Sequence, residues 1–131
     1  MTSDKRTCKA SIKYCTVSPK KMNLVTDLIR RNKAEDAVLK LTYATRLGAK
    51  LVLDLLNSAI ANAVNNNNFD KSRLVIDEIY VGKAFTLKRF MARGRGRSTR
   101  ILKRFCNVTI ILREAGAEEY GNFGKKKKRT K

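Results

Sequence analysis

The hydrophobic pattern first alternates with period two over residues 8–17, which predicts a strand with one buried face and one polar face. Lysines recur on the polar side, so we expect that face to be cationic and exposed. The side predicted to be buried carries Cys8, Ala10, Ile12, Tyr14 and Thr16.

Helical spacing of the apolar residues replaces this alternation after residue 17. Ser18 and Pro19 supply an N-cap residue and a proline at the first helical position. The asparagine run at 65–68 favours a turn and ends the helical pattern. We therefore predict helices over residues 19–30, over residues 34–41, and from Ala44 or Thr45 to this asparagine run.

Two later segments, residues 74–81 and 106–112, are rich in β-branched residues and predict strands. Residues 82–105 between them would form a long hairpin, with a tip near residues 91–96 where Gly94 and Gly96 permit positive φ. Arms of about 15 residues would span on the order of 50 Å, whereas a body of this size is about 30 Å across. The sequence predicts an α+β fold, with three helices packed on a small antiparallel sheet and a long protruding β-hairpin.

The overall charge indicates a polyanionic partner. The chain has 30 Lys and Arg against 11 Asp and Glu, a formal net charge of +19. No stretch approaches the roughly 20 apolar residues of a membrane span, so we expect nucleic acid and no membrane. The N-terminus carries no visible targeting signal.

The three cysteines lack a metal-binding spacing and histidine is absent, which predicts buried reduced thiols and no metal or cofactor.

The cations are concentrated in the predicted hairpin, because the stretch from Ile79 through Arg113 contains ten Lys or Arg and no acid. Like charges facing each other across two strands would weaken the hairpin, so phosphates would complete its folding. Lys20 and Lys21 follow a predicted helix N-terminus, which also favours anions. The candidate RNA-binding residues are Lys20, Lys21, Lys83, Lys88, Arg89, Arg93, Arg95, Arg97, Arg100, Lys103 and Arg104.

Each of these patterns also has an interpretation without a specific site. A charge run can be a solvated basic face, and residues 93–97 can be a disordered Arg-Gly repeat that binds RNA loosely. The lysines after Ser18 can be solvated residues beside an ordinary cap. Phe90 and Met91 can clamp the hairpin or face a cavity or partner, and the sequence does not decide between these roles.

The chain divides into one body and a tail by composition. We expect residues 1–113 to form a single RNA-binding domain, with the extended hairpin at about residues 82–105. Residues 114–131 have no hydrophobic periodicity and finish in six cations out of seven residues, which predicts a flexible basic tail.

Three blocks of sequence resemble one family in order and spacing. They are SPKKMNLVTDLIR at residues 18–30, LNSAIANA at 56–63 and LKRFMARGRGRSTRILKR at 87–104. Together they are similar to the large-subunit ribosomal protein twenty-two family of the bacterial type, over about residues 8–113. Two positions depart from the family pattern: Ala92 stands where proline is common, and Asn107 where histidine is common.

The resemblance implies a structural constituent of the large ribosomal subunit, with no catalytic activity, that aids subunit assembly. Its partners would be 23S-type rRNA, neighbouring large-subunit proteins and the nascent polypeptide, and it would not be a homo-oligomer. It would work in the cytoplasm within a bacterial ribosome, or in an organelle matrix. The hairpin would line the polypeptide exit tunnel, with a tip made of Phe90, Met91, Ala92, Arg93, Gly94 and Arg95.

Two other classes of protein compete with this interpretation. An architectural DNA-binding protein can use a basic β-ribbon as a minor-groove arm, although such ribbons usually carry a wedge at the tip and Ala92 is not one. An enzyme would need an acid–base pair or an activated nucleophile. The scattered acids and the lack of histidine offer neither.

Overall fold

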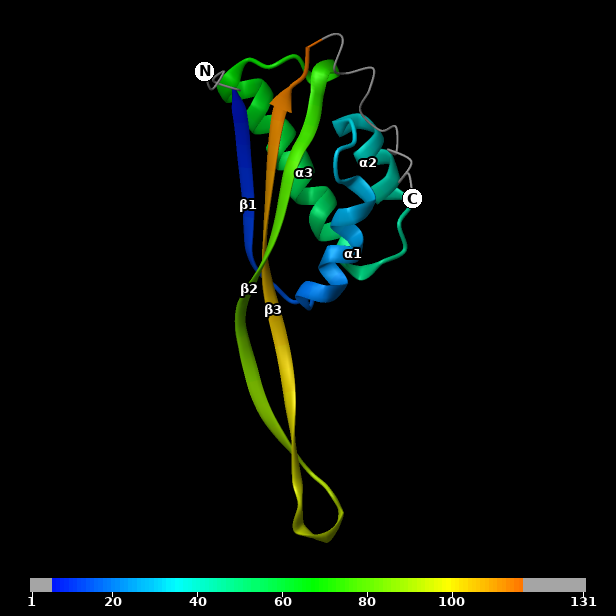
Figure 1. Cartoon of the computed structure of the whole chain (residues 1–131), viewed down its shortest axis with the longest axis vertical. Coiled ribbons are helices and arrows are strands. Elements are labelled where there is room, and N and C mark those ends of the chain that lie inside the picture. The colour runs from blue at the N-terminus through cyan, green and yellow to red at the C-terminus, as the bar shows by residue number, and fades with distance from the viewer. Residues whose placement is uncertain (1–5, 117–131) are drawn as a thin grey trace, which may run out of the picture.

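The computed structural model describes residues 6–116, which fold into three α-helices and one three-stranded antiparallel sheet with strand order β1-β3-β2 (Figure 1). This confirms the predicted α+β class and its long hairpin. The elements are β1 Thr7–Cys15, α1 Pro19–Ile29, α2 Ala34–Thr42, α3 Leu47–Asn67, β2 Leu74–Ala92 and β3 Ser98–Glu114, with short 3-10 turns at Lys71–Arg73 and Gly94–Gly96.

The hydrophobic core lies between the helices and one face of the sheet. In Figure 1 all three helices lie on the same side of the sheet, and the hairpin formed by β2 and β3 extends away from them. Met22 of α1, Leu56 of α3 and Ile110 of β3 are fully buried together in this core. Alternate residues of β3 between Cys106 and Leu112 are buried, as period two requires for a strand with one covered face.

The ends of the helices follow local backbone chemistry. Pro19 occupies the first turn of α1, and the carbonyl of Ser18 accepts a hydrogen bond of 3.0 Å from the Met22 amide, although the Ser18 side chain makes no capping bond. Asn68 takes a left-handed conformation with φ of 52° and ends α3 within the asparagine run, as predicted. The start of α3 is different, because Arg46 is the N-cap and the helix begins at Leu47.

α3 requires one correction to the sequence interpretation. It has 21 residues, and an 18-residue window within it has a mean hydropathy of 1.3, so it is long and apolar enough to cross a membrane by length and composition alone. Its buried residues, among them Val52, Leu56 and Ala59, instead belong to the protein core. Lys50 and Asp54 are exposed on the other side. We therefore interpret α3 as the central helix of a folded body.

The buried face predicted for β1 is wrong beyond Ile12. Lys13 and Tyr14 together face Asn107 of β3, which makes a β-bulge. The extra residue reverses the alternation, so Cys15 and Val17 are buried whereas Tyr14 and Thr16 are exposed. Tyr14 has a φ of 59°, and its amide donates a 3.0 Å hydrogen bond to Oδ1 of Asn107.

The expected like-charge repulsion across the hairpin is wrong for directly paired residues. In the β2–β3 register each cation of the shaft faces an apolar or uncharged residue. The pairs are Leu87 with Lys103, Lys88 with Leu102, Arg89 with Ile101, Phe90 with Arg100, and Thr86 with Arg104. A shift of one residue would destroy this complementarity, so the register itself separates the charges.

The C-terminal boundary of the body lies beyond residue 113. Glu114 is the last residue of β3, and Ala115 is buried with its amide donating to the Arg73 carbonyl at 3.0 Å. Glu114 and Ala115 thus belong to the body rather than to the predicted tail. Gly116 is the last described residue, and residues 117–131 of that predicted tail lie outside the described residues.

Candidate nucleic-acid interface

A two-stranded ribbon extends from the sheet where β1 ends. The last β1 pair is Cys15 with Cys106, and beyond Lys83 only β2 and β3 pair with each other. From Ala84 to Ala92 the nine residues of β2 span about 30 Å at roughly 3.3 Å each. The ribbon is long relative to its own core, and Figure 1 shows it projecting well beyond the helices.

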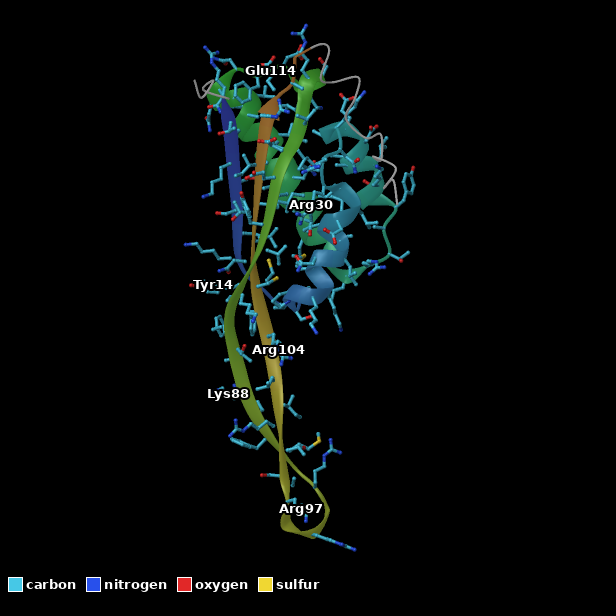
Figure 2. All side chains as sticks on the ribbon, in the orientation of Figure 1. Tyr14, Arg30, Lys88, Arg97, Arg104 and Glu114 are labelled. Carbon is cyan, nitrogen blue, oxygen red and sulfur yellow. The ribbon has the colours of Figure 1, made fainter. Side chains whose placement is uncertain are left out.

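The cations predicted from the sequence lie on this ribbon and at its base, and all are exposed. Figure 2 shows Lys88 and Arg104 along the shaft and Arg97 at the far end. β2 carries Lys83, Lys88 and Arg89; the end loop carries Arg93, Arg95 and Arg97; β3 carries Arg100, Lys103 and Arg104; α1 carries Lys20 and Lys21.

Among the described residues, no ion pair with an acidic side chain compensates the charge of the ribbon. Between residues 6 and 116 the ion pairs join Arg30 to Asp27 at 3.4 Å, Arg73 to Asp70 at 3.7 Å and Arg113 to Asp77 at 3.1 Å. All three pairs are within the body, so none of them neutralises a cation between residues 83 and 104. Close, unpaired cations favour a polyanion that can neutralise them together.

The end of the ribbon is a loop of residues 93–97. The Arg93 amide donates to the Arg97 carbonyl at 2.8 Å, and Nε of Arg93 donates to Oγ1 of Thr99 at 3.1 Å. Positive φ values occur at Arg95 (59°) and Gly96 (68°). Of the two glycines that permit positive φ, Gly96 adopts it and Gly94 does not, and Arg95 takes the other left-handed position.

The residues assigned to the tip occupy two parts of the ribbon. Arg93, Gly94 and Arg95 belong to the end loop, whereas Phe90, Met91 and Ala92 are the last residues of β2. Phe90 and Met91 pair with Arg100 and Thr99, and their side chains are 70% and 45% exposed. A hairpin clamp would bury these side chains, so their exposure favours contact with something outside the chain.

The base of the ribbon meets the N-terminus of α1 around a small hollow of about 320 Å³. Lys20 contributes from α1, Lys83 from β2 and Arg104 from β3. The unpaired amides of a helix N-terminus favour an anion, and these three cations strengthen that preference. The fold therefore joins Lys20 to the hairpin residues, whereas Lys21 is exposed outside this hollow.

An aromatic cluster that the sequence did not predict lies at the base of the ribbon, where β1 ends. The ring centroids of Tyr14 and Phe85 are 5.5 Å apart, and those of Phe85 and Phe105 are 4.5 Å apart in a stacked arrangement. The three residues come from three different strands, and two of them lie at bulges. Only the irregular strand pairing brings them together, so hydrophobic periodicity could not reveal the cluster.

The cysteines are buried thiols, as predicted, since Cys8, Cys15 and Cys106 are all free and buried. Burial, with the neighbouring Cys15, raises the pKa of the Cys106 thiol to about 11, so this thiol is protonated at neutral pH. Over residues 6–116 no group of three or more His, Cys, Asp or Glu side chains could hold a metal ion.

A larger hollow of about 520 Å³ lies between α2 and α3, on the body rather than on the ribbon.

A compact α+β body that carries an exposed, uncompensated basic β-ribbon is typical of a nucleic-acid-binding protein. The chain belongs to the family described as ribosomal protein L22p/L17e, whose match covers residues 10–113. This membership confirms the resemblance seen in the three sequence blocks.

Several bacterial relatives are named large ribosomal subunit protein uL22. The chain is 51% identical over 110 residues to the large ribosomal subunit protein uL22 of Methylobacterium sp. (strain 4-46), which covers 84% of this chain and 87% of the relative. It is 49% identical over 108 residues to the protein of that name from Rhodospirillum rubrum, covering 82% and 86%. For the Agrobacterium fabrum protein the identity is 50% over 105 residues, with 80% of each chain covered.

Proposed function

We propose that this protein is a structural constituent of the large ribosomal subunit that binds 23S-type rRNA mainly through its β-ribbon. The observation that carries the proposal is the run of exposed cations from Lys83 to Arg104, which has no acidic partner within residues 6–116. Membership in a ribosomal protein family, which is not a class of enzymes, supports a non-catalytic role. The protein would work within the ribosome, in the bacterial cytoplasm.

The ribbon binds by exchanging condensed counterions for its own side chains. Each phosphate that an Arg or Lys neutralises releases a counterion, which favours binding at low salt. Arginine predominates and can hold a phosphate through two hydrogen bonds at once. Because the ribbon is long, it contacts RNA segments that are distant from the body and holds them together, which is how it aids assembly of the subunit.

The far end of the ribbon lines the nascent polypeptide exit tunnel in this proposal. Exposed Phe90 and Met91 beside the loop of residues 93–97 give this end an apolar and a cationic surface, both open to a passing chain. The body would remain at the outer surface of the subunit, in contact with neighbouring ribosomal proteins. No second copy of the chain is required.

Competition binding tests the nucleic-acid class. A labelled 23S-type rRNA fragment bound to the protein at about 150 mM salt should resist excess duplex DNA and yield to excess unlabelled fragment, since structured RNA offers single-stranded segments as well as phosphates. Gel shift measures the bound fraction. Displacement by duplex DNA at lower concentrations than by the RNA fragment would favour the architectural DNA-binding role instead.

A cross-linking experiment tests the position of the ribbon end. The three native thiols are buried, so an Arg95→Cys variant can be labelled selectively with a thiol-linked photo-cross-linker at neutral pH. In ribosomes that carry a stalled, radiolabelled nascent chain, we expect a cross-link from position 95 to that chain. A Lys40→Cys variant on exposed α2 is the control and should give none. Equal cross-linking from both positions would contradict the proposed tunnel location.

A further inference from the structure

The cluster of Tyr14, Phe85 and Phe105, called here the neck cluster, lies where the three-stranded sheet becomes the two-stranded ribbon. Tyr14 is 61% exposed and Phe85 46% exposed, and neither belongs to the hydrophobic core. Phe85 and Phe105 stack with an angle of 19° between their planes, whereas Tyr14 is tilted by 53° to Phe85. In Figure 2 Tyr14 lies at the neck, on the side away from the helices.

Two backbone irregularities at the same level expose these rings. The bulge in β1 gives Tyr14 its φ of 59°, a conformation that costs a bulky residue free energy. A second register shift sets Ala84 and Phe85 of β2 together opposite Phe105 of β3. Asn107 fixes the first bulge through its hydrogen bond to the Tyr14 amide. The fold thus maintains an exposed aromatic surface where regular pairing would have pointed Tyr14 inward.

The charges around the cluster indicate its ligand. Nζ of Lys103 lies 5.8 Å from the centroid of the Phe105 ring, and further cations follow along the ribbon. Phe85 has one face against Phe105, so Tyr14 at the open end of the cluster can accept another flat ring. An anionic polymer whose monomers carry flat, apolar rings matches both properties. Single-stranded RNA is such a polymer, because its unpaired bases stack on aromatic side chains beside cations that hold its phosphates.

We propose that the neck cluster is a stacking platform for an unpaired RNA base, with Tyr14 as the ring that contacts the base. The proposal rests on the proposed rRNA binding and adds a second kind of contact to it. The ribbon cations bind phosphates regardless of sequence, whereas the platform selects RNA with an unpaired nucleotide at the neck. Lys103 would lie beside the phosphate of that nucleotide.

Tryptophan substitution gives a direct measurement, because the chain has no tryptophan. A Tyr14→Trp variant would carry a single indole in the platform, and a base stacked on it should quench its fluorescence when a 23S-type rRNA fragment binds. Tyr43→Trp is the matched control, since Tyr43 is 82% exposed and follows α2. We expect strong quenching at position 14 and little change at position 43, with filter binding used to confirm that each variant has bound the fragment.

A Tyr14→Leu variant separates stacking from electrostatics. Leucine retains an apolar side chain and the same backbone restriction but removes the aromatic face. We expect about a five- to hundredfold loss of affinity for the rRNA fragment, the range that base–aromatic stacking supports. The slope of log affinity against log salt should stay unchanged, because the ring carries no charge. Circular dichroism checks that each variant folds.

The outcomes distinguish this inference from the proposed function. If the unmodified protein fails to bind rRNA in a salt-dependent way, the proposed function fails. If it binds, but the indole of the Tyr14→Trp variant is not quenched and the Tyr14→Leu variant binds normally, the platform alone is overturned. Quenching of that indole by neighbouring ribosomal proteins, and not by the rRNA fragment, would also overturn it and assign the cluster to a protein contact.

Discussion

Replacing Arg93, Arg95 and Arg97 with alanine is expected to weaken binding to a 23S-type rRNA fragment about a hundredfold at roughly 150 mM salt. These three residues form the cationic part of the end loop, all are exposed, and none has an acidic partner among residues 6–116. Each phosphate left without its cation should reduce the slope of log affinity against log salt by about 0.7–0.9. The triple variant should therefore show a slope shallower by about 2–3, measured by filter binding over a salt series.

The matched control removes the same charge from the body. Lys40 of α2, Arg46 before α3 and Lys50 of α3 are exposed, and an alanine triple variant at these positions also lowers the net charge by three. We expect its affinity to change less than about fivefold, because these cations are away from the ribbon and act only through screened long-range attraction. Equal decreases in affinity for the two variants would mean that the overall charge, rather than the ribbon, governs RNA binding.

The second large effect concerns stability. Replacing Leu56 with alanine should lower the free energy of unfolding by about 3 kcal/mol, because the substitution leaves a cavity in the core. Leu56 is fully buried in α3 within the main hydrophobic cluster. A decrease of this size is a large part of the roughly 5–15 kcal/mol by which small domains are stable. Guanidinium unfolding followed by circular dichroism measures it.

Two controls show whether this decrease reflects the core alone. Leu47→Ala makes the same chemical change in the same helix at a side chain that is 80% exposed, and it should change stability by less than about 0.5 kcal/mol. The triple arginine variant should also retain the unfolding free energy of the unmodified protein, because its residues lie outside the core. Destabilisation of that variant by as much as Leu56→Ala would show that the ribbon and the body fold as one unit.

The sequence predicted the regular elements well because their signals are local. Helical spacing after Pro19 and the asparagine run before Phe69 reflect backbone preferences that hold in most folds. The start of α3 was predicted two or three residues early, since Arg46 serves as an N-cap without a capping side chain that could be recognised. The cations of the ribbon were predicted from the run of Lys and Arg in the sequence. The fold leaves these side chains exposed.

The bulges could not be predicted, because they depend on which residues face each other across strands. Tyr14 continues the hydrophobic alternation of its segment, yet one extra residue opposite Asn107 turns it outward. Similarly, the number of charges in the hairpin predicts repulsion, whereas the register sets Lys88 opposite Leu102 and Phe90 opposite Arg100. Register is a property of two segments and of the turn that joins them.

The sequence by itself determined the class of fold, the exposed cations of the hairpin and the buried thiols, because composition and periodicity reflect transfer of single residues between water and core. The family followed from three sequence blocks in order and spacing. Tertiary structure decided which side chains meet. It joined Lys20 to Lys83 and Arg104 around one hollow, and it assembled the neck cluster from three strands. Such contacts join residues that are far apart in the chain, and their geometry depends on strand pairing and on the packing of α1 against the sheet.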